Sequence, residues 1–288
     1  MSDQPIPRRL NFGCGYDKRE GYLNVDSDPA CEPDVLLVDN DLSVLPRHGF
    51  DEILAHDVLE HIPRAVTPAI LLEWADLLTD GGKLVLQTSS IEGVASQLAD
   101  NPSFRDQHGW TICLFGNQAH PGDFHLTGFT DMTLSVHLLA AGFRVDSMWV
   151  TDHWLLHAEA TKVADWTDVV EQHATSDDEE FLAAAYRAML DRESDDSGRV
   201  HFTNALAEGR ASRRDVVKEL GSSPEHLFVV AAANGFEGER RPGIAARLSP
   251  YVPDSLRPYA RRAAERAVDW RAAVRRTFGS LRRREPVS

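Results

Sequence analysis

The sequence lacks the features that would place it in a membrane or in an oxidising compartment. No apolar run approaches the roughly 18 residues needed to span a bilayer, and the N-terminal segment MSDQPIPRR has no apolar core of the signal-peptide kind. Only three cysteines are present, Cys14, Cys31 and Cys113, and their spacing matches neither a zinc site nor a disulfide framework. We therefore expect a cytoplasmic protein without structural zinc or disulfides.

Positive charge is scarce outside the C-terminal end. The 288 residues carry a formal net charge of −15, but residues 240–285 hold thirteen arginines against four acids, which leaves −24 on the remainder. Because neutralised phosphates supply most non-specific affinity for nucleic acid, a body this acidic is not expected to bind nucleic acid as its substrate. The 42% apolar content and the length allow a sizeable core with an additional domain.

Strand and helix signals alternate over residues 9–160. Helices are expected after Thr67, with Pro68 in the first turn and Gly81-Gly82 as the stop, and from Thr130 to Gly142. The first two strands are too close for a crossover helix, so a loop or single turn should join them. The alternation predicts a doubly wound, Rossmann-like α/β sheet covered on both faces. The strand-like apolar runs are 9–13, 22–25, 35–38, 50–55, 83–88, 143–150 and 154–160.

A glycine turn joins the first two of these runs, in the segment RRLNFGCGYDKREGYLNVD. Glycines after a strand let the backbone approach a bound group, and an acid ending the next strand can hold a ribose diol. A dinucleotide fingerprint would have a third glycine where Lys18 stands and an acid about twenty residues on, whereas Asp26 follows Gly13 closely. The turn therefore favours a nucleoside without phosphates over NAD. The alternative is an ordinary tight turn.

The segments LNFGCG, GYLNVD, DLSVLP, FDEILAHDVLEHIP and LTDGGKLVL, in this order, resemble class I S-adenosylmethionine-dependent methyltransferases, in particular a small bacterial LNFGCG/NVD/LEH group. The resemblance implies S-adenosylmethionine as the cofactor. Asn11 and Asp17 depart from the wider superfamily, which often has an acid and a third glycine there. The implied cofactor-binding residues are Gly13, Cys14 and Gly15 beneath the methionine part, Asp26 at the ribose, Asp41 and Leu42 at the adenine, and His56 and Asp57 near the sulfonium.

Transfer of a methyl group to a hydroxyl needs alignment and also a general base, for which histidine is suited. The segment CLFGNQAHPGDFHLTGFTD, residues 113–131, is expected to be a loop between a strand and a helix. We predict His125 as the base, with His120 as second choice. The alternatives are a divalent ion held by His120, Asp123 and His125, or histidines with a structural role. A metal cluster of His56, Asp57, Glu60 and His61 is a further alternative, but the resemblance implies that LEH anchors a loop and helix, so no metal is predicted.

The second half of the chain has helix-capping signals. Ser176 with Glu179 and Ser212 with Asp215 form capping boxes, and Ser223-Pro224 begins another helix. Residues 178–228 resemble a helical domain of unknown function attached to bacterial enzymes of glycan and cell-surface assembly. Its acidic stretch 191–196 lacks the final bidentate Glu of a calcium loop, which favours a solvated turn over a calcium site. The resemblance rests on Phe181, Tyr186, Leu190, Arg192, Asp195, Gly198, Leu206, Gly209 and Ser223-Pro224-Glu225.

Residues 255–285 predict a basic amphipathic helix. One stripe of this helix is apolar and arginines cover the rest, so the helix is expected either to pack on the acidic body or a protein partner, or to lie on the inner membrane face. The stripe consists of Leu256, Tyr259, Ala263, Ala267, Trp270, Val274, Phe278 and Leu281.

We therefore predict three parts: a methyltransferase domain over 1–165, a small all-α domain over 176–232, and a linker with the basic helix over 233–288. The predicted function is O-methylation of a sugar hydroxyl in a surface polysaccharide or glycolipid, in which the glycan is implied only by the second resemblance. The alternatives are a non-catalytic cofactor-binding scaffold in glycan assembly, and a methyltransferase for small molecules or proteins.

Overall fold

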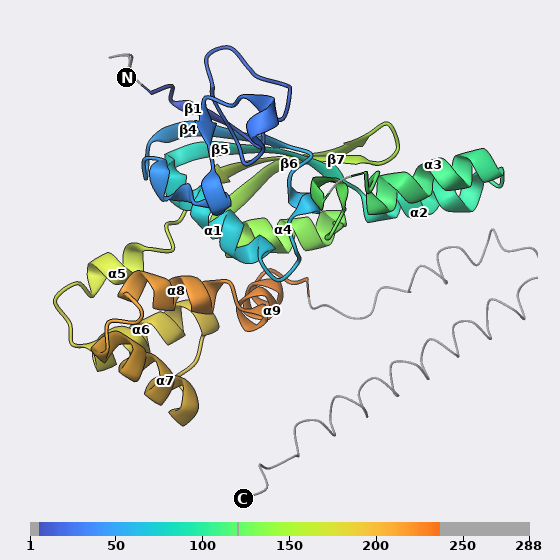
Figure 1. Ribbon diagram of the computed structural model, residues 1–288. Helices are drawn as coiled ribbons and strands as arrows, with labels where there is room; N and C mark the ends of the chain where they lie inside the picture. The colour runs from blue at the N-terminus through green and yellow to red at the C-terminus, as the bar shows by residue number, and fades with distance from the viewer. Residues whose placement is uncertain (1–5, 120, 237–288) are drawn as a thin grey trace, which may run out of the picture. The chain divides into compact units, whose positions relative to one another are not determined.

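The computed structural model describes residues 6–119 and 121–236, which belong to one compact unit, Met1–Phe236 (Figure 1). The predicted helix over 255–285 and the second-choice base His120 lie outside the described residues. Among the described helices, none has the length and apolar character needed to cross a membrane.

A seven-stranded sheet forms the centre of the unit, in the order β3-β2-β1-β4-β5-β7-β6. Of the seven described strands, β7 runs opposite to the other six, so it pairs antiparallel with both β5 and β6, and the remaining pairs are parallel. This is the predicted Rossmann-like α/β fold, and a turn without a helix joins its first two strands, as expected. The strands are β1 (Arg9–Phe12), β2 (Leu23–Asp26), β3 (Val35–Leu36), β4 (Phe50–His56), β5 (Leu78–Ser89), β6 (Phe143–Thr151) and β7 (Leu155–Lys162).

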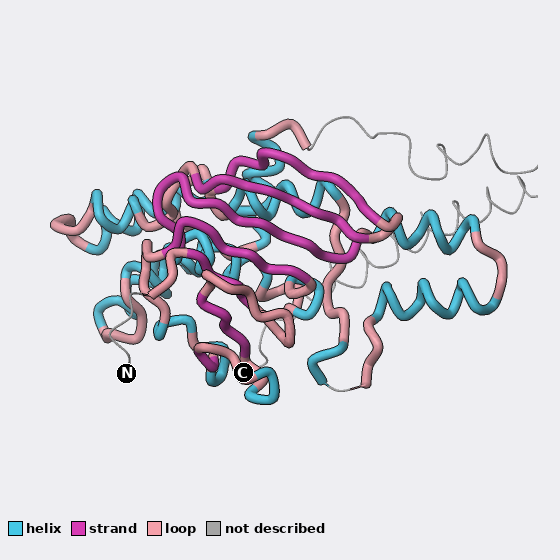
Figure 2. Tube along the Cα trace, turned by 90° about the horizontal axis from the view of Figure 1, so that it is seen from above, coloured by secondary structure: helices cyan, strands magenta, loops and turns pink. Residues whose placement is uncertain are grey.

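The two helices that cross between strands, α1 (Thr67–Leu77) and α4 (Asp131–Ala140), lie on the same face of the sheet. Described residues do not provide the expected cover on both faces of β5, β7 and β6. On the outer face of these strands, Lys83, Glu159 and Arg144 are solvent-exposed. Figure 2 shows this face from above, with the helices beneath it. The antiparallel pairing explains the difference, because an antiparallel sheet can leave one face in water.

Three predictions about helix ends are wrong. Helix α1 starts at Thr67 without a side-chain cap, and it ends at Leu77, before Gly81-Gly82, because Leu78 already pairs with Phe50 of β4. The helix α6 (Asp178–Leu190) is capped by Asp177 and not by the predicted Ser176. The Asp177 side chain accepts from Glu180 N (2.8 Å).

A helical hairpin between β5 and α4 was not predicted. It consists of α2 (Ile91–Asp100) and α3 (Phe104–Phe115), capped by Ser90 and Ser103, and it projects beyond the end of the sheet (Figures 1 and 2). The first residues of the predicted loop 113–131 are therefore helical.

The helical unit packs on the side of the sheet that carries α1 and α4. Trp166 Nε1 donates to the Leu72 carbonyl of α1 (2.8 Å), and His226 Nε2 lies 3.0 Å from the Ala140 carbonyl of α4, so one hydrophobic core continues through both parts. The predicted Ser212 capping box and Ser223 cap are confirmed. The helices are α5 (Asp168–Gln172), α6 (Asp178–Leu190), α7 (Asp196–Ala207), α8 (Arg213–Gly221) and α9 (Pro224–Ala233).

Candidate functional site

The glycine turn after β1 leaves room beside its backbone. Gly13 (φ +65°) and Gly15 (φ +49°) adopt the left-handed conformation that favours glycine. A Cβ at Gly13 would come within 2.7 Å of Val58 Cγ2, whereas one at Gly15 would meet no protein atom within 4 Å. Gly13 is therefore required for packing, and Gly15 borders open space.

Cys14 lies between these glycines and is buried, with its N–H bonded to the Val25 carbonyl (3.0 Å). Burial and, secondarily, the nearby Asp26 carboxylate raise the pKa of this thiol to about 11. A thiol that stays protonated near neutral pH is a poor nucleophile. We therefore assign Cys14 a structural role in the turn and no role in covalent catalysis.

Asp26 ends β2 and is tied to the turn. Its Oδ2 accepts from Gly15 N and its Oδ1 from Asp28 N, both at 2.8 Å. Each carboxylate oxygen can accept more than one hydrogen bond, so a partly exposed Asp26 retains acceptor capacity. The arrangement suits two adjacent ligand hydroxyls.

Asn11 stands where the superfamily that the sequence resembles often has an acid, and the structure explains the amide. This buried amide donates to Asn24 Oδ1 (3.0 Å) and to the Asp17 carbonyl (2.8 Å). Asn24 in turn accepts from Arg19 N (2.7 Å). Asn11 therefore fixes the loop between β1 and β2, which replaces a crossover helix.

The residues implied at the adenine are placed by a short 3₁₀ helix, Leu42–Val44. Asp41 caps it by accepting from Ser43 N and Ser43 Oγ (2.9 Å each), and the backbone bond lowers the pKa of Asp41. Leu42 is buried in the hydrophobic core. The pair thus presents an anchored carboxylate beside an apolar side chain.

His56 ends β4, and Asp57 follows it with a left-handed backbone (φ +53°). Gln87 Nε2 on β5 lies 3.1 Å from both oxygens of Asp57. Burial, together with the positive Arg19, lowers the pKa of the half-buried His56. Because β1, β2, β4 and β5 are parallel, these residues meet the glycine turn and Asp26 at the carboxyl edge of the sheet.

Glu60 connects this edge to the loop of His125. Its carboxylate is 1% exposed and accepts from Thr88 Oγ1 (2.9 Å), with Ser89 Oγ at 3.5 Å, and burial raises its pKa to about 7. Its backbone carbonyl accepts from Leu126 N (2.6 Å) and Thr127 N (3.1 Å). Sequence reasoning gave the LEH stretch an anchoring role and named Glu60 only as a member of an alternative metal cluster. It did not predict a buried carboxylate that joins two segments, although an acid inside an apolar run was an available signal.

His125 is half-buried beside two residues of this edge. Its Nδ1 lies 3.5 Å from Ser89 Oγ, and its ring meets that of His61 edge-on at 4.9 Å between centroids. Burial, with a smaller contribution from His61, lowers the pKa of His125. The imidazole is therefore neutral at pH 7 and able to accept a proton.

The alternative metal clusters are not formed by the described residues. His56, Asp57, Glu60 and His61 do not bring ligand atoms together, and the cluster with His120 includes a residue outside the described part. A different group, His48, Asp76 and Asp165, does come together in residues 6–119 and 121–236.

Cations already compensate that group of acids. Asp76 pairs with Arg47 and Arg214, and Lys162 Nζ lies 2.6 Å from Asp165 Oδ2. The positive charges disfavour an additional cation, so we assign no metal there.

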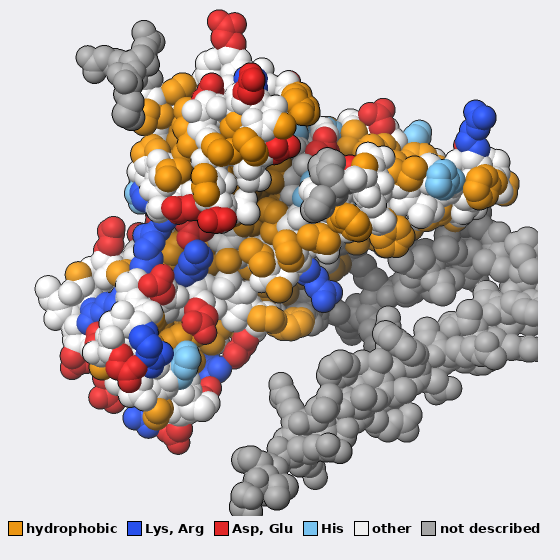
Figure 3. Space-filling model, viewed as in Figure 1, with side chains coloured by type: hydrophobic (Ala, Val, Ile, Leu, Met, Phe, Trp, Pro, Cys, Tyr) orange, Lys and Arg blue, Asp and Glu red, His pale blue; other side chains and the backbone are white. Residues whose placement is uncertain are grey.

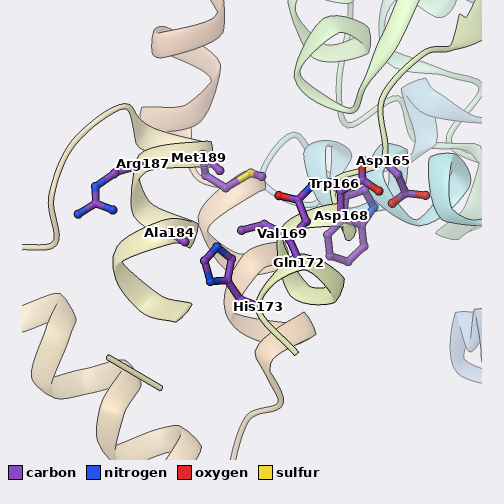
Figure 4. A pocket seen from close by; sticks show the side chains of 10 residues that line it. Asp165, Trp166, Asp168, Val169, Gln172, His173, Ala184, Arg187 and Met189 are labelled. Carbon is purple, nitrogen blue, oxygen red and sulfur yellow. The ribbon is translucent and has the colours of Figure 1, made fainter. Parts of the chain in front are cut away.

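A hollow of about 500 Å³ lies elsewhere, in the helical unit (Figure 4). Trp166, Val169 and Met189 supply its apolar lining, and His173 and Arg187 contribute polar groups. None of the predicted site residues lines it, so the sheet edge and not this hollow remains the candidate site.

One family model matches part of the chain. Residues 167–228 match the family described as "Domain of unknown function (DUF4214)". This bears out the predicted resemblance to a helical domain of unknown function. No curated protein sequence matches the chain.

Solved structures similar to the chain include a SAM-dependent methyltransferase from Methanosarcina mazei, with 18% identity, 56% of this chain and 94% of that chain covered, and a TM-score of 0.40. A 1,6-didemethyltoxoflavin-N1-methyltransferase from Burkholderia thailandensis, solved with S-adenosylhomocysteine, has 16% identity, 55% and 72% coverage, and a TM-score of 0.38. A possible exported protein from Bordetella parapertussis has 15% identity, 55% and 63% coverage, and a TM-score of 0.39. The chain therefore spans less than two thirds of this last protein, and all three likenesses are distant.

Proposed function

We propose that the chain is an S-adenosylmethionine-dependent methyltransferase that methylates a sugar hydroxyl of a surface polysaccharide or glycolipid. The observation that carries the proposal is the glycine turn hydrogen-bonded to Asp26 at the carboxyl edge of the sheet, through Gly15 N. The residues fit this cofactor, because Gly15 borders open space and Asp26 offers an anchored carboxylate next to it. When bound, S-adenosylmethionine supplies a methyl group activated by the positive sulfur.

The chain's own contribution is alignment and proton removal. Asp26 holds ribose hydroxyls, and the turn Gly13–Gly15 supports the amino acid part. The His125 imidazole, whose Nδ1 lies 3.5 Å from Ser89 Oγ, accepts the proton of the acceptor hydroxyl. The lowered pKa of His125 keeps the ring neutral for this step.

The glycan acceptor is proposed from the resemblance of the helical unit alone. Mass spectrometry of surface glycans from cells with and without this protein tests it, and a missing methyl increment is expected in the deletion. The matched control is the deletion strain carrying the chain with Asp26→Ala, which should not restore the increment. Unchanged glycans in the deletion would refute this acceptor.

For residues 255–285, outside the described part, we propose packing on the acidic body or a protein partner at a cytoplasmic location. Nine net positive charges in residues 240–285 adjoin a remainder of −24, an oppositely charged partner at high effective concentration. A chain ending at residue 250 should then melt at a lower temperature than the full chain. Pelleting of the full chain with anionic but not neutral liposomes would instead show a membrane role.

A further inference from the structure

The hairpin of α2 and α3 exposes apolar side chains that take no part in the proposed methyl transfer. Val94 is the only buried residue of α2, and none of α3 is buried. Phe104 is 84% exposed, Phe115 51% and Ile112 36%. Figure 3 shows hydrophobic side chains exposed along this hairpin.

These residues share one face of α3. Positions 104, 108, 112 and 115 repeat at helical spacing, and the ring of His108 stacks on Phe104 with 5.7 Å between centroids. At about 1.5 Å rise per residue, the stripe from Phe104 to Phe115 is roughly 16 Å long. We call Phe104, His108, Ile112 and Phe115 the α3 stripe.

The C-terminal end of the α3 stripe, at Phe115, lies beside His125, the candidate base. His125 N donates to the carbonyl of Phe115 (3.1 Å). Gly116 (φ +77°) permits this approach, because a Cβ there would lie 1.7 Å from the Asp123 carbonyl and 3.1 Å from the His125 ring. One end of the stripe is therefore fixed beside the place where an acceptor hydroxyl would lie, and the other end points away from the sheet.

The charge of the hairpin indicates what lies on the stripe. Residues 91–115 hold one arginine against three acids, so the segment offers no cationic cluster for an anionic headgroup or for nucleic acid. An uncharged apolar chain matches it better. A surface of this kind, continuous with a reactive site, typically binds a part of the ligand.

We infer that the α3 stripe binds the hydrocarbon portion of an amphiphilic acceptor whose polar hydroxyl-bearing end lies at His125. The inference rests on the proposed function and narrows its acceptor to a neutral glycolipid in place of a free polysaccharide. A second copy of the chain packed hairpin to hairpin is the competing occupant, and the test separates the two.

The probe is n-dodecyl β-D-maltoside below its micelle concentration, with maltose as the head group alone, measured by titration calorimetry. Dodecyl maltoside should bind the wild type more tightly than maltose. The double variant Phe104→Ser/Ile112→Ser should weaken this binding about tenfold or more, because it removes two apolar side chains that the bound hydrocarbon would cover. Phe228→Ser, which removes a 65% exposed phenylalanine from α9, should leave it within about twofold.

Equal binding by the wild type and the double variant, or by maltose and dodecyl maltoside, would overturn the inference. So would light scattering that shows a wild-type dimer and a monomeric double variant with unchanged amphiphile binding. S-adenosylhomocysteine binding, measured on the same samples, reports separately on the proposed function. The double variant should retain it, and its absence from the wild type would refute the methyltransferase and not the apolar surface.

Discussion

Two regions of the molecule bury carboxylates in opposite ways. At the junction of the sheet and the helical unit, Asp76 is fully buried and paired with Arg47 and Arg214. At the carboxyl edge of the sheet, Glu60 is 1% exposed, and within residues 6–119 and 121–236 its carboxylate is hydrogen-bonded by the hydroxyls of Thr88 and Ser89. Charges compensated by ion pairs stabilise a junction, whereas acids and imidazoles held by neutral donors keep a protonation equilibrium near neutral pH.

The Glu73 carboxylate extends the contrast. Burial disfavours its charged form, but hydrogen bonds from Lys218 and Arg47 outweigh this, and the pKa of Glu73 is lowered. The pKa of Glu60 moves the other way, to about 7. Two buried glutamates therefore differ because one faces cations and the other faces hydroxyls.

The largest expected effect tests the chemistry of the sheet edge. His125→Ala should slow methyl transfer about 10²- to 10⁴-fold, as expected for loss of a general base, with S-adenosylhomocysteine affinity nearly unchanged. The wild-type rate should fall as the pH drops through the pKa of this imidazole, which is lowered from about 6.5. His201→Ala, on exposed α7, is the control. Full activity of His125→Ala with a flat pH profile would leave His125 a structural role.

Glu60→Gln and Glu73→Gln should change stability with opposite signs. The folded-state pKa of Glu60 is raised, so its contribution is present below about pH 4.5 and is lost as the pH rises toward 7. Relative to the wild type, Glu60→Gln should therefore gain up to about 3 kcal/mol at pH 8, at 1.36 kcal/mol per pKa unit. Glu73, with a lowered pKa, stabilises above its unfolded pKa, so Glu73→Gln should lose stability at pH 8. Urea unfolding at pH 5 and 8 measures both, and shifts of the same sign would contradict the contrast.

Asp26→Ala should weaken S-adenosylhomocysteine binding by about 1.5–3 kcal/mol, the range for a hydrogen bond to a charged group. Calorimetry measures it, and NAD should bind the wild type less tightly than S-adenosylhomocysteine does. Asp41→Ala, which removes the carboxylate implied at the adenine, gives a second measurement within the same site. Tighter binding of NAD would refute the assignment of the cofactor.

The smallest effect concerns the junction. Arg214→Ala removes a partner of buried Asp76 and the guanidinium that lies over the Trp166 ring at 4.7 Å, and should destabilise the chain by about 2 kcal/mol. Arg187→Ala breaks only the exposed pair with Glu193 and should change stability by less than about 1 kcal/mol. Equal losses in urea unfolding would show that the buried pairs do not hold the helical unit in place.

The sequence by itself determined the local features of this protein. Short-range patterns predicted every strand, the caps at Ser212 and Ser223, and the turn of Gly13 and Gly15, although β5 begins five residues earlier than expected. These depend on backbone conformation and side chains only a few positions apart, and such information is present in neighbouring letters.

Only the tertiary structure decided which distant residues meet. Gly15 N bonds to Asp26, and the Glu60 backbone holds the loop of His125, because parallel strands bring their carboxyl ends to one edge. Asp76 finds Arg214 only when α8 packs on α1. The helix over 104–115 was also missed, because Trp110, Cys113 and Leu114 lie opposite the face of Phe104 and Ile112 and weaken the helical period. Contacts between segments far apart in the chain depend on how the layers pack, which no local pattern specifies.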